Sequence, residues 1–181
     1  MLYEGKSKIV YEGEDPKTCV IKYKDTATAG NGAKKEDLPE KGKLNAEISN
    51  IIFKYLMANG IKTHLIKVID ETSVLVKKAE IVMVEVIVRN VAAGSFSKKY
   101  GVPEGTALKN TVVEFSYKSD ELGDPMINDS QITALGIATQ DELDQLKEMS
   151  LKIDQLMIDL FAKAGIKLID FKLEFGRVDG E

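Results

Sequence analysis

Residues 169–176 (Ile-Asp-Phe-Lys-Leu-Glu-Phe-Gly) alternate between apolar and charged side chains. In an extended strand this alternation puts Asp170, Lys172 and Glu174 on one face and the apolar side chains on the other. At about 3.3 Å per residue, the two carboxylates stand about 13 Å apart with the ammonium between them. A rigid row of acid, base and acid suits a polyanion bound with a divalent cation. An amphipathic edge strand with a solvated face is the alternative.

Two charges interrupt the apolar run 81–88, which is otherwise typical of a central strand buried on both faces. Glu85 and Arg89 share a face but lie about 13 Å apart, so each needs its own partner, because an unpaired buried charge is costly. Arg89 precedes the small-residue turn 90–95, which ends in Ser95. A guanidinium beside such a turn suits a phosphate or carboxylate. An internal network of Arg89 with Asp or Glu side chains is the alternative.

Further charged groups lie in turns. In residues 3–8 (Tyr-Glu-Gly-Lys-Ser-Lys), Lys6 and Lys8 are predicted to share a face at the edge of the first strand and to reach one triphosphate. The segment is not a Walker A loop, and surface lysines are the simpler alternative. The loop 117–126 could bind Mg²⁺ or an amine, although such loops are more often solvent-facing turns. Its carboxylates are Asp120, Glu121 and Asp124.

Composition narrows the function classes. The 181 residues carry a net charge of −4 with a pI near 5.3, whereas a nucleic-acid-binding protein is normally basic. Cys19 is the single cysteine and His64 the single histidine. This count argues against a disulfide framework, a catalytic triad and a histidine-based zinc site.

The expected location is the reducing cytoplasm, because no pair of cysteines is available to form a disulfide. No segment approaches the ~18 apolar residues of a membrane span, so no membrane association is expected. Lysines, an arginine and several carboxylates remain as the chemical inventory. This inventory fits phosphoryl chemistry, in which catalysis consists mainly of positioning and charge stabilisation.

The hydrophobic pattern predicts the elements that position these residues. Strands are predicted at 7–11, 18–23, 63–69, 73–77, 81–88, 111–117 and 166–175. Helices are predicted at 43–59, 95–100 and 139–164, the last beginning with the capping box Thr139-x-x-Glu142. The polar segment 25–42 is predicted to lack regular structure. The buried stripe of the first long helix is predicted to be Leu44, Ile48, Ile51, Ile52, Tyr55 and Leu56.

These elements predict an α+β fold with two lobes. Residues 1–78 would form a β-rich lobe, a small antiparallel sheet with one helix across it. Residues 79–181 would form an α/β lobe. The crevice between two lobes is the default place for a ligand.

The motifs together resemble those of the SAICAR synthetase (phosphoribosylaminoimidazole-succinocarboxamide synthase) family. Residues 85–95 resemble one family signature and residues 168–176 the other. Shorter segments at 3–8, 25–32, 41–45 and 123–126 also resemble family segments, so the resemblance runs through almost the whole chain. It implies a two-lobed fold reminiscent of protein kinases, with a nucleotide-binding N-terminal lobe and ATP between the lobes.

The resemblance also implies a reaction. The family joins the carboxylate of carboxyaminoimidazole ribotide (CAIR) to the amine of L-aspartate during purine biosynthesis, forming ADP and phosphate. The implied route passes through an acyl phosphate that the aspartate amine attacks. Mg²⁺ and ATP are the implied cofactors, and the implied partners are small molecules, with no nucleic acid. A homodimer is one open alternative for the oligomeric state.

Roles for individual residues follow from their positions in the family pattern. ATP phosphates would contact Lys6, Ser7 and Lys8, and the adenine would lie beside Lys77, Glu80 and Ile81. The ribotide would be held by Arg89 and Ser95. Lys172 would lie near the transferring phosphoryl group and Glu174 would bind nucleotide or Mg²⁺; with Arg89, these form the implied catalytic set. Further substrate or metal contacts would come from Asn31, Lys118 and Asp124.

Two departures from the family pattern stand out. Met83 occupies a position where proline is usual. The chain also stops at Glu181, before a segment that would supply a Mg²⁺-binding aspartate and an arginine for the ribotide, so a truncated sequence is expected. Two alternatives to a ligase remain, namely a small-molecule or protein kinase and a non-catalytic nucleotide-binding fragment. The kinase alternative lacks a Gly-x-Gly-x-x-Gly loop and a His-Arg-Asp loop.

Overall fold

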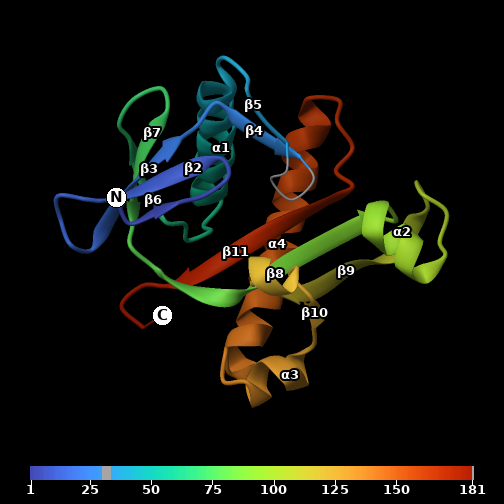
Figure 1. The fold of residues 1–181 in the computed structure, drawn as a ribbon. Helices are drawn as coiled ribbons and strands as arrows, with labels where there is room; N and C mark the ends of the chain where they lie inside the picture. Colours follow the sequence, from blue (N-terminus) through green and yellow to red (C-terminus); the bar gives the residue numbers. More distant parts are fainter. Residues whose placement is uncertain (30–33, 181) are drawn as a thin grey trace. The chain divides into compact units, whose positions relative to one another are not determined.

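The computed structural model describes residues 1–29 and 34–180 (Figure 1). The chain divides into two compact units, Met1–Ala79 and Glu80–Glu181. Each contains an antiparallel sheet and at least one helix.

The first unit is built on a five-stranded sheet in the order β1-β2-β3-β7-β6, in which every neighbouring pair is antiparallel. Its strands are β1 (Tyr3–Glu4), β2 (Lys8–Glu12), β3 (Thr18–Tyr23), β6 (Leu65–Val68) and β7 (Ser73–Lys77). Helix α1 (Lys41–Ala58) packs on this sheet. The core of the unit consists of Cys19, Tyr23, Ala46, Leu65, Val74 and Val76. Cys19 is therefore a buried packing residue.

The predicted buried stripe of α1 is wrong for half of its members. Leu44, Ile48 and Ile51 are each more than half exposed, whereas Ala46 is fully buried. The helix approaches the sheet through its small residues: a Cβ on Gly42 would lie 3.0 Å from the Tyr23 carbonyl oxygen. The hydrophobic pattern predicts burial of the large apolar residues of a helix. Close approach of the helix to the sheet instead requires small residues at the contact.

The segment 25–42 also differs from its prediction. It contains a two-stranded antiparallel ladder of β4 (Thr26–Ala29) and β5 (Lys34–Asp37), and then the start of α1. β5 is exposed along its whole length. A ladder held by backbone hydrogen bonds needs no apolar face, so it leaves no hydrophobic pattern in the sequence. The Asp25 carboxylate accepts a hydrogen bond from the Gly42 N–H (2.8 Å) and so ties this segment to α1.

The second unit is built on a four-stranded antiparallel sheet in the order β10-β9-β8-β11. Its strands are β8 (Glu80–Val91), β9 (Ala107–Tyr117), β10 (Met126–Ile127) and β11 (Asp170–Arg177). The helices are α2 (Gly94–Tyr100), α3 (Asp129–Ala134) and α4 (Gln140–Lys163), with one 3-10 turn, η1 (Asp120–Leu122). Helix α4 runs along one face of the sheet (Figure 1), and its Leu143 and Leu146 pack against Val82, Val84 and Val86.

Two strand predictions need correction. β11 begins at Asp170 rather than at residue 166, because residues 166–169 follow the end of α4 without joining the ladder. β8 is central in its sheet, as predicted, but only one of its faces carries an unbroken row of buried apolar side chains, namely Val82, Val84, Val86 and Val88. On the other face Ile81 and Met83 are 42% and 43% exposed. Here the bulky side chains reflect strand propensity rather than burial.

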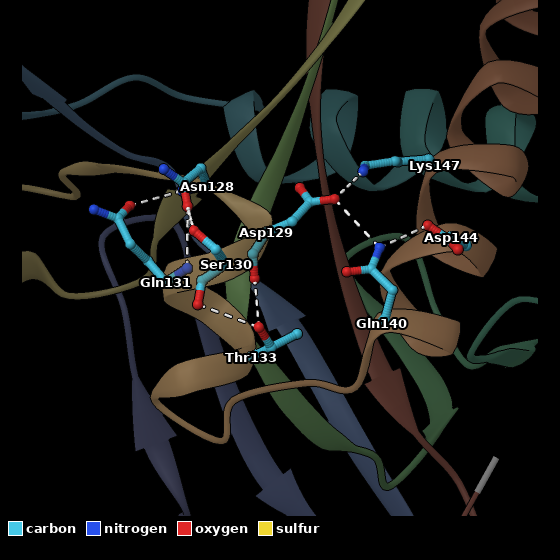
Figure 2. Close-up of polar contacts among 8 residues, drawn as sticks. All are labelled: Asn128, Asp129, Ser130, Gln131, Thr133, Gln140, Asp144 and Lys147. Atoms are coloured by element: carbon cyan, nitrogen blue, oxygen red, sulfur yellow. Dashed lines mark hydrogen bonds and ion pairs between the residues drawn. The ribbon is translucent and has the colours of Figure 1, made fainter.

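The start of α4 is confirmed. Thr139 caps the helix, and both halves of the capping box with Glu142 are present. In the neighbouring α3, Asn128 and Gln131 form a second capping box (Figure 2). Asp129 accepts hydrogen bonds from Gln140 and Lys147 of α4, which connect the two helices. The hydrogen bond from Lys147 holds the pKa of Asp129 below its usual value.

Glu142 serves both the cap and an ion pair. Its carboxylate accepts hydrogen bonds from the Thr139 N–H (2.7 Å) and from Arg177 Nε of β11 (2.5 Å). The Arg177 guanidinium, followed by the Thr139 N–H, lowers the pKa of Glu142 to about 2. The charged form of Glu142 therefore stabilises the folded unit.

We expect Glu142→Gln to keep the capping box, because an amide oxygen also accepts a hydrogen bond at that position, and to lose the ion pair. The folded-state pKa lies below the ordinary value of 4.5, so the stabilisation is present above that pH and is lost as the pH falls towards about 2. Thermal unfolding should show a Tm difference between wild type and variant at pH 7 that closes across this interval. A difference that stays constant down to pH 2 would contradict the assigned charge effect.

The described residues contain no helix that is long and apolar enough to cross a membrane.

Candidate functional site

The second unit gathers the charged residues of three strands on one face of its sheet, which we call the polar face. Residues directly opposite each other in an antiparallel pair point to the same side. β8 lies between β9 and β11, and its residues 85–89 each have a partner on both sides, with Glu85, Ile87 and Arg89 sharing one face. The polar face consists of Glu85, Ile87 and Arg89 of β8, Ser116, Glu114 and Val112 of β9, and Glu174, Lys172 and Asp170 of β11. The row predicted for β11 is therefore confirmed as a single face.

The opposite face of β11 explains why this row is held rigidly. Leu173 and Phe175 pack against the apolar core beneath α4. The charged side chains are then fixed by the strand rather than by a loop. β11 is also an edge strand, but its polar face is paired and not merely solvated.

Arg89 is buried within the polar face, with 8% of its surface exposed. Its Nε donates to Glu114 (2.8 Å), its Nη1 to Asp170 (2.6 Å) and its Nη2 to the Ser95 hydroxyl (3.3 Å). The guanidinium also lies 5.9 Å from the centre of the Phe96 ring. The internal Arg–carboxylate network that the sequence left open is therefore present. It brings Arg89 and Ser95 together at the start of α2.

Lys172 and Glu85 form a second pair. Lys172 Nζ donates to the Glu85 carboxylate at 2.6 Å, and the Ser116 hydroxyl donates to the same oxygen at 3.1 Å. Glu85 is 6% exposed, while the Lys172 side chain is about half exposed. Each of the two interior charges of β8 thus has its own partner, as the sequence predicted.

Glu174 and Lys118 form a third pair at 3.0 Å, and both side chains remain substantially exposed. Asp124 has a different role in the neighbouring loop. Its carboxylate accepts a hydrogen bond from the Ser119 N–H (3.0 Å), and its φ of 48° is a turn conformation that Asp tolerates. One Asp124 oxygen therefore shapes the loop. Within the described residues, no three Asp, Glu, His or Cys side chains form a cluster that could hold a metal ion.

In the first unit, Lys6 and Ser7 lie in the turn between β1 and β2, and Lys8 begins β2. The turn is closed by a hydrogen bond from the Gly5 N–H to the Lys8 carbonyl oxygen (2.8 Å). Lys6 precedes β2, so strand alternation does not fix its side chain relative to that of Lys8, and their shared face stays a prediction. Lys8 Nζ lies 5.2 Å from the centre of the Tyr23 ring.

The other predicted contacts fall near the boundary between the units or outside the described residues. Lys77 ends β7 in the first unit, while Glu80 and Ile81 begin β8 in the second. Asn31 lies outside the residues that the structure describes.

The structure adds residues that the sequence interpretation missed. Glu114 and Ser116 interrupt the apolar pattern of a strand at alternate positions, and this was the available signal. Behind the polar face, Asn90 donates to Asp154 of α4 (2.7 Å) and accepts from Thr111 (2.9 Å). Burial raises the pKa of the Asp154 carboxyl. This buried contact ties the end of β8 to the helix beneath it.

Comparison with known proteins gives consistent matches. The sequence model of the family described as SAICAR synthetase matches residues 1–181. A phosphoribosylaminoimidazole-succinocarboxamide synthase of Clostridium novyi (strain NT) is 54% identical over 181 residues, which is 100% of this chain and 77% of the relative. The chain thus spans about three quarters of that relative's length.

Solved structures agree with the sequence match. The phosphoribosylaminoimidazole-succinocarboxamide synthase from Ehrlichia chaffeensis has a TM-score of 0.96 and 43% identity, over 99% of this chain and 76% of that one. A SAICAR synthetase in complex with ADP has a TM-score of 0.94 and 45% identity, with the same coverage of 99% and 76%. These matches confirm the predicted resemblance and the α+β fold class. The chain belongs to the SAICAR synthetase family.

Proposed function

We propose that this protein is an ATP-dependent ligase of purine biosynthesis that condenses CAIR with L-aspartate to give SAICAR, ADP and phosphate. The observation that carries the proposal is the polar face, which gathers Arg89, Lys172 and Glu174 within a chain that matches the family throughout. Family membership favours a ligase over the kinase alternative. The proposed enzyme would act on small molecules in the cytoplasm.

The proposed reaction has two steps. In the first, an oxygen of the CAIR carboxylate forms a bond to the γ-phosphorus of ATP, the bond from that phosphorus to ADP breaks, and an acyl phosphate results. In the second, the aspartate amine attacks the acyl carbon, phosphate leaves with the bonding electrons, and the nitrogen loses a proton to give the amide. Both steps concentrate negative charge on phosphoryl oxygens, so positioned cations are the main contribution that the protein makes.

We assign these contributions to residues of the polar face and of the segments that follow β8 and β9. Lys172 places an ammonium beside the transferring phosphoryl group. Arg89 and Ser95 hold the ribotide, with the guanidinium oriented by Glu114 and Asp170. Lys118 and Asp124 remain candidates for contacts with substrate.

Nucleotide binding is assigned to the first unit and to the strand that follows it. The phosphates would contact Lys6, Ser7 and Lys8, and the adenine would lie beside Lys77, Glu80 and Ile81. The exposed apolar surface of Ile81 at the start of β8 suits an aromatic base. The solved SAICAR synthetase with ADP supports a nucleotide site in this fold.

Glu174 is the residue that fits Mg²⁺. Mg²⁺ commonly takes one or two carboxylates and completes its shell with waters and substrate phosphates, so one carboxylate on the polar face is compatible with it. When bound, the ion would neutralise charge on the nucleotide phosphates. To bind the ion, the Glu174 carboxylate would release its contact with Lys118, and its exposed side chain allows this change.

An activity assay tests the proposal. Protein incubated with ATP, MgCl₂, CAIR and L-aspartate should release ADP and inorganic phosphate in equal amounts, and omission of aspartate should abolish amide formation. Absence of ADP in the complete mixture would contradict the ligase assignment. A phosphorylated product that remains intact when aspartate is present would favour the kinase alternative. Calorimetric binding of ATP without any turnover would favour the nucleotide-binding fragment.

A further inference from the structure

Glu85 is a buried acid that contacts Lys172, the residue proposed to lie beside the transferring phosphoryl group. It lies directly opposite Glu174 on β11 and opposite Ser116 on β9, with only 6% of its surface exposed. A second carboxylate so close to phosphates would repel them if it faced them directly. Its burial indicates a role other than contact with substrate.

The contacts of Glu85 indicate that role. One of its carboxylate oxygens accepts from both Lys172 Nζ (2.6 Å) and the Ser116 hydroxyl (3.1 Å). A buried carboxylate without a cation is unfavourable, so the pairing with Lys172 is expected to persist when substrate binds. An ammonium has three N–H donors, so Lys172 can hold Glu85 and still donate to a phosphoryl oxygen.

The cross-strand geometry strengthens this pairing. Glu85 and Glu174 form a directly opposed pair of like charges, which is destabilising unless cations separate them. Lys172 contacts the first carboxylate and Lys118 the second. Movement of Lys172 away from Glu85 would leave two acids facing each other. The Lys172 ammonium is thus confined to one place, although its side chain is long and half exposed.

We infer that Glu85 is a positioning residue for Lys172, holding its ammonium where the phosphoryl group is transferred. This inference rests on the proposed function and assigns Glu85 no contact with substrate. A flexible lysine that is already oriented loses less freedom in the transition state, and this preorganisation raises kcat rather than substrate affinity.

Glu85→Gln tests the inference, because glutamine keeps the size of the side chain and removes its charge. We expect kcat to fall by about 10- to 100-fold while KM for ATP and for CAIR change little. In a Lys172→Ala background the same substitution should have no further effect on kcat, since the group it positions is gone. The matched control is Glu142→Gln, which also breaks an ion pair between a carboxylate and a cation of β11 but lies on the α4 side of the sheet. It should keep the wild-type kcat.

The outcomes distinguish failure of the proposed function from failure of the positioning role of Glu85. If the wild-type enzyme makes no ADP, the proposed function fails. If the wild type is active and folded Glu85→Gln keeps its kcat, or if the losses from Glu85→Gln and Lys172→Ala multiply as independent effects, only the positioning role is overturned. Should Glu85→Gln not fold, Glu85→Asp keeps the charge, shortens the side chain and should also lower kcat at unchanged KM. A folded Glu85→Asp enzyme with wild-type kcat would overturn the role as well.

Discussion

Replacement of Lys172 by alanine is expected to lower kcat by about 10²- to 10³-fold, the loss typical for removal of one preorganised charge-stabilising donor. ATP affinity should change much less. The reason is that the proposed contact of Lys172 strengthens only when charge accumulates on the transferring phosphoryl group, whereas the other nucleotide contacts stay in place. Steady-state kinetics gives kcat, and calorimetry gives the Kd of ATP.

The same substitution removes the ammonium that pairs with the buried Glu85 carboxylate and leaves the hydrogen bond from the Ser116 hydroxyl, so some loss of stability is expected as well. Thermal unfolding should therefore accompany the kinetics, and rates should be compared at a temperature where both proteins are folded. Lys147→Ala is a suitable control, because Lys147 pairs with Asp129 between α3 and α4. It should affect stability without the loss of kcat. Equal losses of kcat and ATP affinity in Lys172→Ala would contradict the proposed role.

Arg89→Ala is the substitution with the largest expected effect on stability. Arg89 and Glu114 side chains are 10% and 13% exposed, so loss of the guanidinium leaves the Glu114 carboxylate nearly buried and unpaired. Breaking a buried pair from one side costs about 3–5 kcal/mol. Asp170 is more exposed and can be solvated in part. Chemical denaturation would measure the lost free energy of unfolding.

The same variant should raise KM for CAIR and leave the Kd of ATP nearly unchanged, since the proposed partner of Arg89 and Ser95 is the ribotide. The double variant Arg89→Ala/Glu114→Ala separates the two effects. Removal of the Glu114 carboxylate, which Arg89→Ala leaves without its cation, should restore part of the stability, but KM for CAIR should remain high. A KM that recovers together with stability would show that Arg89 only supports the fold. A large loss of ATP affinity would contradict its assignment to the ribotide.

Local patterns predicted much of the fold. β3 and β7 were placed at their observed bounds, and the capping box at Thr139 located the start of α4. These signals are short-range: alternation and helix capping depend on residues that are close in the chain. The exposed β4–β5 ladder and the rotation of α1 about its axis left no such signal. Both depend on which surface the chain meets after folding.

The candidate site divides in the same way. The alternation in β11 sufficed to put Asp170, Lys172 and Glu174 on one face. It could not reveal that Lys172 pairs with Glu85, 87 positions earlier in the chain, or that Arg89 pairs with Glu114. Those partners follow from the order of the strands and from the register of each pair.

The sequence by itself determined the chemical inventory, the family resemblance and the face on which each charged residue of β11 lies, because a strand fixes the direction of its side chains locally. Only the tertiary structure decided that β8 lies between β9 and β11, and hence which charges neutralise one another. The physical reason is that a buried charge must find a partner across neighbouring strands, and strand neighbours are set by the packing of the whole unit.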